Sequence, residues 1–286
     1  MSDETVWIWI DGKLVDAERA TVSAFDHGIT VGDGIFETMK VVTDDAGDRQ
    51  GFALRRHLDR LRRSAQGLGL PVAMTDAELR AAVHEVLDAN PATAGRVRIT
   101  ITGGIGPLGS DRGEAPPTIL VATSAAKPWP PSAAVAIVGW RRNEHSPVAG
   151  IKTTSYAENV VALDHAHQRG ASEAIFANTA GLLCEGTGSN VFVGIAGRLI
   201  TPPLRSGCLA GVTRELLLDA TSLGIVEEDL PIDALRDADE AFITSSTRDV
   251  MPVHAVDDHA LPRCPGPLTA AAAHAFAALE AASVDP

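Results

Sequence analysis

The chain has 286 residues, of which 45% are hydrophobic and 21% charged, and its formal net charge is −13 at pH 7. These values are typical of a globular protein with one large domain or two smaller ones. The acidic balance argues against nonspecific nucleic-acid binding, and no apolar run approaches the length of a membrane span.

The N-terminus lacks a basic region followed by an apolar one, which predicts a cytoplasmic protein. The three cysteines have no metal-site spacing and are expected to be reduced structural thiols, so no metal site is predicted.

The first part of the chain alternates strand-like and helix-like segments. Residues 54–70 have apolar residues at helical spacing, and Thr75 with Glu78 fits a capping box at the start of the next helix. Residues 96–102 alternate strictly between polar and apolar, which predicts a strand with one polar face. The elements expected here are strands at 6–10, 13–15, 35–42, 96–102 and 118–122, and helices at 54–70 and 75–89.

A proline-rich stretch at 126–132 is the predicted linker, because prolines stiffen the chain and cannot donate to a strand ladder. Mixed strands and helices on both sides of it predict two α/β domains with a cofactor in the cleft between them. After the linker we expect strands at 133–138, 173–177, 182–185, 190–193, 198–201 and 240–244, and helices at 156–169, 212–223 and 268–282.

Lys152 is one of only four lysines in the chain. It lies between a strand-like run and a helical pattern, where partial desolvation favours a neutral amine. Such a lysine can form a Schiff base with a carbonyl compound or with pyridoxal phosphate. A surface lysine beside a turn is the alternative that this residue alone leaves open.

Four further segments have side chains suited to an anionic, ring-containing ligand, and each also has an ordinary structural explanation. Gly211 at a helix start, with Thr213 behind it, suits a phosphate or is a simple N-cap. The hydroxyl run 244–247 suits an anion or satisfies its own turn. Arg60 is a fixed positive charge or part of a solvated helix face. Glu185 needs a partner such as a protonated pyridine nitrogen, unless it ends an exposed hairpin.

Taken together, these segments resemble the class IV (fold-type IV) pyridoxal-phosphate enzymes. That family includes branched-chain aminotransferases, D-amino-acid aminotransferases and aminodeoxychorismate lyases. The resemblance runs from about Gly32 to Val253, with all its motifs in the family's order. They are Gly32-Asp33-Gly34-Ile35-Phe36-Glu37, His57-Leu58-Asp59-Arg60-Leu61, Lys152 with Asn159, Glu185-Gly186 through Asn190-Val191-Phe192, Leu209 to Arg214, and Ser245-Ser246-Thr247 through Pro252-Val253.

The resemblance implies roles for these residues. Lys152 would bind pyridoxal 5′-phosphate covalently and then act as base and acid, and Glu185 would pair with the ring nitrogen. Leu209 would pack against a face of the ring. The phosphate would be held by Arg60, the Val212 backbone, Thr213 and Ser246.

The family's fold implies a smaller N-terminal α/β domain at 1–125 and a larger C-terminal, cofactor-binding domain at 133–286. Family members are homodimers or larger, and loops that contact substrate cross the subunit interface. We therefore expect a homo-oligomer acting on amino acids and 2-oxo acids.

The substrate is less well defined by the sequence. The strand from Phe36 to Val41 is most similar to that of D-amino-acid aminotransferases, which predicts D-amino-acid or broad specificity. The Arg and His with which that type holds a substrate carboxylate are replaced by 103–105, so Arg98 and Arg112 are the candidate substitutes. The predicted substrate residues are Phe36, Thr38, Lys40, Arg98 and Thr247.

Two alternatives remain open. Thr38 matches a threonine of the lyases, which release pyruvate and 4-aminobenzoate from aminodeoxychorismate. A cofactor carrier without catalysis is a second alternative, although retention of both Lys152 and Glu185 favours an enzyme.

Overall fold

A computed structural model describes residues 5–44, 46–91, 93–126 and 128–286. The chain forms two compact units: a first unit of residues 1–127, 151–156 and 283–286, and a second unit of 128–150 and 157–282. The boundary at 127/128 falls inside the predicted linker 126–132, of which residue 127 lies outside the described residues. The first unit also includes residues 151–156 and 283–286, which follow the linker in the sequence.

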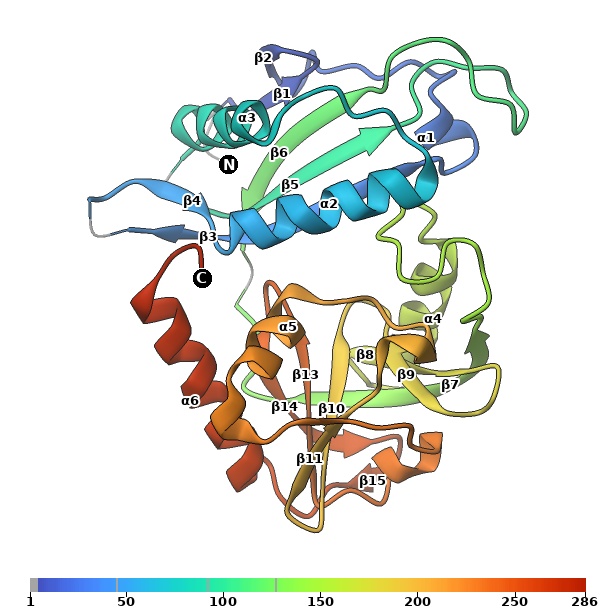
Figure 1. Ribbon diagram of the computed structural model, residues 1–286, viewed down its shortest axis with the longest axis vertical. Coiled ribbons are helices and arrows are strands. Elements are labelled where there is room, and N and C mark those ends of the chain that lie inside the picture. The colour runs from blue at the N-terminus through green and yellow to red at the C-terminus, as the bar shows by residue number, and fades with distance from the viewer. Residues whose placement is uncertain (1–4, 45, 92, 127) are drawn as a thin grey trace. The chain divides into compact units, whose positions relative to one another are not determined.

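The first unit is built on a six-stranded antiparallel sheet with strand order β2-β1-β6-β5-β3-β4. Helices α2 and α3 lie across one face of this sheet (Figure 1). The elements are β1 (Trp7–Ile10), β2 (Lys13–Asp16), α1 (His27–Thr30), β3 (Gly34–Thr43), β4 (Arg49–Gly51), α2 (Leu54–Leu68), α3 (Asp76–Ala89), β5 (Ala94–Thr102) and β6 (Ile119–Ala125).

The polar–apolar alternation of β3 and β5 determines which side chains face the helices. Ile99 and Ile101 of β5 are fully buried in one cluster with Leu58 and Leu61 of α2. Thr38 pairs with Arg98 in the β3–β5 register, so both side chains lie on the opposite face. The predicted capping box at the start of α3 is confirmed, with both reciprocal hydrogen bonds formed.

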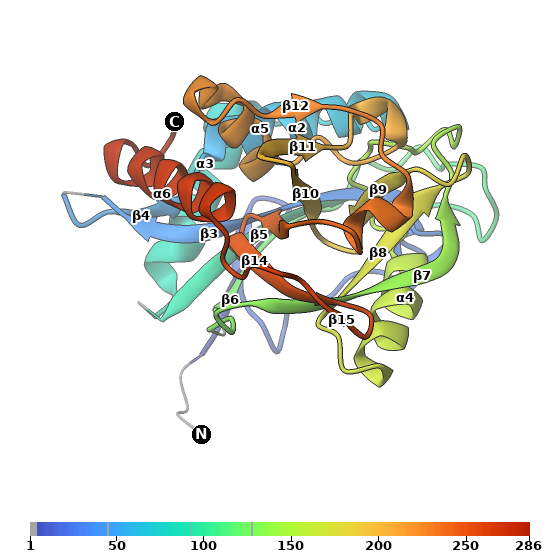
Figure 2. The same cartoon turned by 90° about the horizontal axis from the view of Figure 1, so that it is seen from below.

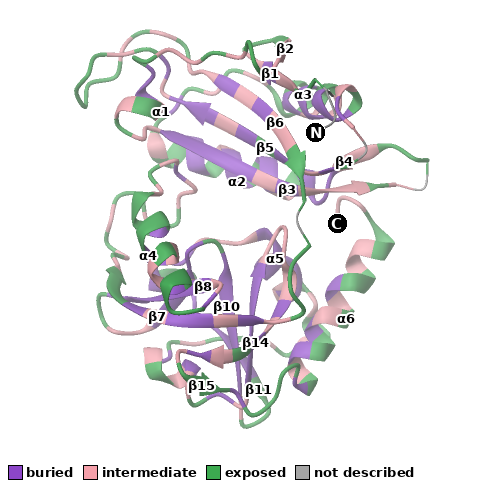
Figure 3. Cartoon of the chain, turned by 180° about the vertical axis from the view of Figure 1, so that it is seen from behind, coloured by how far each residue is buried: buried purple, intermediate pink, exposed green. Residues whose placement is uncertain are grey.

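The second unit is built on a nine-stranded mixed sheet, with order β12-β11-β10-β13-β14-β7-β8-β9 and β15 paired to β14. Helix α4 lies beside β7 and β8 (Figure 2), and the strands are largely buried (Figure 3). The elements are β7 (Ala133–Arg142), α4 (Ala157–Gln168), β8 (Glu173–Asn178), β9 (Leu183–Gly186), β10 (Asn190–Ile195), β11 (Arg198–Thr201), α5 (Val212–Asp219), β12 (Val226–Glu227), β13 (Glu240–Ser245), β14 (Asp249–Val256), β15 (His259–Ala260) and α6 (Pro267–Ala282).

Several elements of the second unit differ from the sequence prediction, which does not include the two-residue strands β12 and β15. The helix expected at 212–223 ends at Asp219, and a separate 3-10 turn covers Thr221–Leu223. Strand β14 was not predicted, because it contains Pro252, which lacks a donor for the ladder. Among the described residues, no helix combines the length and the apolar character that a membrane crossing requires.

Candidate active site

Lys152 is held against the sheet of the first unit by its own backbone. Its carbonyl accepts a hydrogen bond from the Phe36 N–H on β3 at 3.0 Å, and its N–H donates to the Ser64 hydroxyl on α2 at 3.3 Å. Thr153 forms an antiparallel bridge with Ile35. The segment 151–156 therefore continues the sheet beside β3, and the lysine is fixed on both sides.

The glycines of the Gly32-Asp33-Gly34 motif make room for this segment. A Cβ on Gly34 would lie 2.8 Å from the Thr154 hydroxyl oxygen, and one on Gly32, where φ is +70°, would lie 2.6 Å from that of Ser155. Both hydroxyls donate to the Gly32 carbonyl, at 3.0 and 2.9 Å. The motif therefore supports the backbone that holds Lys152.

The Lys152 amine lies over the Phe36 ring, with Nζ 4.5 Å from the ring centroid. The exposed Arg98 guanidinium stacks on the same ring at 3.7 Å. Tyr156 meets Phe36 edge-on, with centroids 5.1 Å apart. One aromatic side chain thus brings the Lys152 amine and the Arg98 cation together on the face of this sheet opposite helices α2 and α3.

The other predicted substrate residues of the first unit also lie on this face. Thr38 is half-buried directly opposite Arg98. Lys40 lies two residues farther along β3, with its Nζ 4.9 Å from the Phe52 ring centroid. Thr247 belongs to the second unit and is described with that unit below.

Arg60 lies on the helix-covered side of the sheet, in a buried charge cluster with Glu37 and His57. Its Nε and Nη2 donate to the two Glu37 oxygens at 2.8 and 2.6 Å, and His57 Nδ1 lies 2.6 Å from Glu37 Oε2. Burial raises the pKa of Glu37, but the Arg60 charge and the hydrogen bonds from Arg60 and His57 outweigh it and bring that pKa to about 2. Burial lowers the pKa of His57, although Glu37 opposes this effect.

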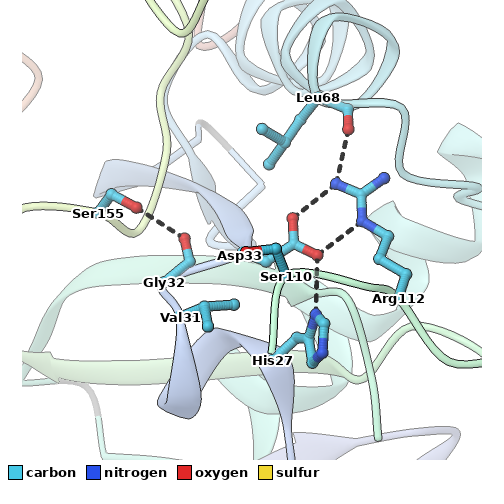
Figure 4. A pocket seen from close by; sticks show the side chains of 8 residues that line it. All are labelled: His27, Val31, Gly32, Asp33, Leu68, Ser110, Arg112 and Ser155. Carbon is cyan, nitrogen blue, oxygen red and sulfur yellow. Dashed lines mark hydrogen bonds and ion pairs between the residues drawn. The ribbon is translucent and has the colours of Figure 1, made fainter. Parts of the chain in front are cut away.

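Arg112, the second candidate for a substrate carboxylate, is engaged elsewhere. It lines a pocket of about 500 Å³ in the first unit. Its Nε and Nη2 donate to the two Asp33 carboxylate oxygens at 2.7 and 2.6 Å, as the dashed lines in Figure 4 show. It also donates to the Leu68 and Gly69 carbonyls. Partial burial raises the pKa of Asp33, but Arg112 and His27 lower it overall. Of the two arginines, only Arg98 shares an aromatic ring with Lys152.

Glu185 lies on β9 in the second unit, where two groups hold its carboxylate. The Leu209 N–H donates to Oε2 at 2.8 Å, and Arg142 Nε lies 3.3 Å from Oε1. Arg142 in turn stacks on Phe176 at 4.3 Å. The side chain is 13% exposed, so this carboxylate is held at a partly open position rather than at a solvated hairpin end.

At the N-terminus of α5, Gly211 lets the Asn190 side chain approach the backbone closely. A Cβ there would lie 1.9 Å from the Asn190 Oδ1 atom, while the Asn190 amide donates to the Leu209 carbonyl at 2.9 Å. Because its N-cap is a glycine, the first amides of α5 receive no side-chain cap. The adjacent Val212 and Thr213 are buried in the first turn, and the N–H groups at the start of a helix can bind an anion.

Ser246 and Thr247 lie in the three-residue loop of the β13–β14 hairpin and are half-buried. The Arg248 N–H closes the turn by donating to the Ser245 carbonyl at 3.2 Å. Asp249 then adopts a left-handed conformation with φ of 55°, a geometry common in three-residue hairpin loops. The turn therefore holds the Ser246 and Thr247 hydroxyls at the end of a buried strand.

Comparison with known proteins assigns this constellation to a family. The family model described as amino-transferase class IV matches residues 34–256. The chain belongs to the class IV aminotransferase family.

Relatives of this aminotransferase differ in the substrates that their names give. A putative branched-chain-amino-acid aminotransferase of Methanocaldococcus jannaschii is 34% identical over 87% of this chain and 88% of its own length. A D-alanine aminotransferase of Bacillus licheniformis is 30% identical over 92% and 93%. The solved branched-chain aminotransferase of Thermoproteus uzoniensis with norvaline has a TM-score of 0.87 and 32% identity, covering 96% of this chain and 94% of its own.

Class IV aminotransferases use pyridoxal 5′-phosphate, and they act on amino acids and 2-oxo acids. The donor set of this chain suits that cofactor, because it offers an amine for the aldehyde, a held carboxylate for the ring nitrogen, and a helix N-terminus without a side-chain cap for the phosphate. The start of α5, whose glycine N-cap gives its first amides no side-chain acceptor, is the observation that supports this fit most directly.

Sequence reasoning missed three charged residues around these positions: Arg142, Glu173 and Arg248. Arg142 and Arg248 are each less than a fifth exposed, and Glu173 is fully buried. Glu173 directly precedes the apolar run 174–177 of β8, and a carboxylate buried beside such a run requires a partner. That signal was available in the sequence, whereas nothing local distinguished the two arginines.

Proposed function

We propose that this enzyme transfers amino groups between D-amino acids, or a broad range of amino acids, and 2-oxo acids, with Lys152 as the catalytic lysine. In this proposal Arg98 binds the substrate carboxylate. The observation that carries the proposal is the shared Phe36 ring, with Lys152 Nζ at 4.5 Å and Arg98 at 3.7 Å. A carboxylate paired with Arg98 would present its α-carbon towards the amine.

In the proposed cofactor site, Glu185 pairs with the ring nitrogen and Leu209 covers a ring face. Arg60, the Val212 backbone, Thr213 and Ser246 hold the phosphate. The bound cofactor supplies an electron sink for the bond broken at the substrate α-carbon.

Transfer of the substrate α-proton would depend on the chain's own residues. Lys152 Nζ would hold the cofactor, and its free amine would act first as the base that takes the substrate α-proton and then as the acid that gives this proton back. Its backbone, fixed by Phe36 and Ser64, limits how far the amine can move between these tasks. The Leu209 N–H and the Arg142 guanidinium hold the Glu185 carboxylate, which would pair with the ring nitrogen.

Thr38 matches a threonine of the aminodeoxychorismate lyases and lies directly across from Arg98. This residue favours a lyase as the second candidate function. Phe36, Lys40 and Thr247 complete the proposed substrate site in both cases. A cytoplasmic location and a homodimer also belong to this proposal, the homodimer because members of the family form homodimers or larger assemblies.

The proposal is tested by mixing the cofactor-loaded protein separately with D-alanine, L-leucine and aminodeoxychorismate. Loss of the cofactor's absorbance band with D-alanine, and formation of a new amino acid when a 2-oxo acid follows, is the expected result. A reaction with L-leucine alone would exclude D specificity. Release of 4-aminobenzoate, with neither amino acid reacting, would assign the protein to the lyases instead.

A further inference from the structure

In the second unit, a fully buried carboxylate organises the turn that follows Glu185. Glu173 Oε1 accepts the backbone N–H of Thr187 at 3.0 Å and also its hydroxyl. Glu173 Oε2 accepts the Ser189 hydroxyl at 3.0 Å. A Cβ on Gly186 would lie only 3.1 Å from the Glu173 carboxyl carbon, so the turn is folded closely around this group.

The same carboxylate is tied to the turn that carries Ser246. Arg248 Nη1 donates to Glu173 Oε2, and its Nη2 donates to the Ser172 carbonyl at 3.3 Å. The guanidinium also stacks on Trp129 at 4.3 Å, leaving the side chain 8% exposed. Because the Arg248 N–H closes the turn around Ser246, a shift of this side chain would move that turn.

The sheet places these two turns at the same end of neighbouring strands. Strands β10 and β13 are neighbours in the sheet (Figure 1), and their antiparallel register places Asn190 opposite Thr244. The turn at 186–189 leads into β10, and the turn at 245–248 leaves β13. The Glu173–Arg248 pair therefore connects the two turns.

We propose that Glu173 and Arg248 are positioning residues that fix the Glu185 turn relative to the Ser246 turn. This inference rests on the proposed function, in which these turns hold the ring nitrogen and the phosphate of one rigid cofactor. The spacing between those two groups is constant, so both contacts form at full strength only when the turns keep a matching separation. A buried charge pair suits this task, because each charge would be uncompensated if the other moved away.

The test compares two probes, pyridoxal 5′-phosphate and pyridoxal, which lacks the phosphate. The dissociation constant of pyridoxal from the apoprotein, divided by that of pyridoxal 5′-phosphate, measures how much affinity the phosphate contact adds. In Arg248→Gln this ratio is expected to fall at least tenfold, and in Arg248→Lys, which keeps a charge for Glu173, by less. Arg236→Gln is the matched control, since Arg236 pairs with Asp257 at 2.6 Å in the same unit.

The control variant is expected to have lower thermal stability and an unchanged ratio of dissociation constants, because it loses an ion pair that has only a structural role. A ratio in Arg248→Gln within twofold of wild type, with cofactor still reducible onto Lys152, would overturn this inference alone. If Arg248→Gln does not fold, Arg248→Lys decides, and a wild-type ratio there overturns the inference. Absence of any reducible adduct in the wild-type protein would overturn the proposed function and this inference together.

Discussion

Replacing Glu37 with glutamine tests the buried charge cluster that holds Arg60. The Glu37 carboxylate receives two hydrogen bonds from Arg60 and lies 2.6 Å from His57 Nδ1, and it is completely buried. The substitution removes the negative charge but keeps the size of the side chain. It leaves Arg60 buried without its counter-ion, a change that is strongly destabilising in other proteins.

The magnitude follows from the pKa of Glu37, which falls from 4.5 to about 2 in the folded protein. That difference corresponds to about 3 kcal/mol of folding stability. Because the folded-state pKa is depressed, this contribution is complete above about pH 4.5 and is lost as pH falls towards about 2. Some 2 kcal/mol of it should be gone, to order of magnitude, by about pH 3.

Urea unfolding, followed by tryptophan fluorescence at a series of pH values, measures this effect. At pH 7, Glu37→Gln should be less stable than wild type by about 3 kcal/mol, and the gap should narrow between about pH 4.5 and pH 3. Glu85→Gln, at an exposed position on α3, is the control for losing a carboxylate. Equal stability of Glu37→Gln and wild type at pH 7, or a gap that does not change with pH, would refute an ionised cluster.

Three further substitutions test the site and the fold. Arg98→Gln should raise KM for the 2-oxo acid by about 10- to 100-fold through loss of a charged hydrogen bond. The control Arg96→Gln, on the same strand, should leave KM unchanged. Similar KM values in the two variants would exclude Arg98 as the residue that binds the carboxylate. Gly211→Ala, whose Cβ would lie 1.9 Å from Asn190 Oδ1, should weaken cofactor binding about tenfold. The control Gly139→Ala, with open space around its Cβ, should bind the cofactor with wild-type affinity. Equal affinities of the two variants would show that the start of α5 does not hold the phosphate. Thr75→Ala should lower the free energy of unfolding by about 1 kcal/mol through loss of the capping box, and an unchanged urea midpoint would contradict that role.

Local patterns in the sequence predicted much of the fold. Alternation predicted β5, helical spacing predicted α2, and the Thr75–Glu78 pair predicted the start of α3. These signals succeed because each depends on residues within one or two turns or on one strand face. Strand β14 was missed because Pro252 donates no hydrogen bond to a ladder, although the strand pairs with β13 directly before it.

The surroundings of Lys152 could not be read from the sequence. Its pairing with β3 joins segments more than 100 residues apart, and the motif glycines at 32 and 34 gave no sign of which segment they admit. The choice between Arg98 and Arg112 likewise required the structure, because only the contacts of Arg112 with Asp33, Leu68 and Gly69 show that it is engaged. The predicted roles at Glu185, Thr213 and Ser246 remain to be tested by binding measurements.

Reduction of the cofactor-saturated protein with borohydride, followed by peptide mass analysis, tests the catalytic lysine most directly. The chain has only Lys13, Lys40, Lys127 and Lys152 as lysines, so the outcome is unambiguous. A pyridoxyl group on the peptide containing Lys152, and its disappearance in Lys152→Ala, is the predicted result. A modified peptide containing another lysine, or no modified peptide, would contradict the assignment of Lys152.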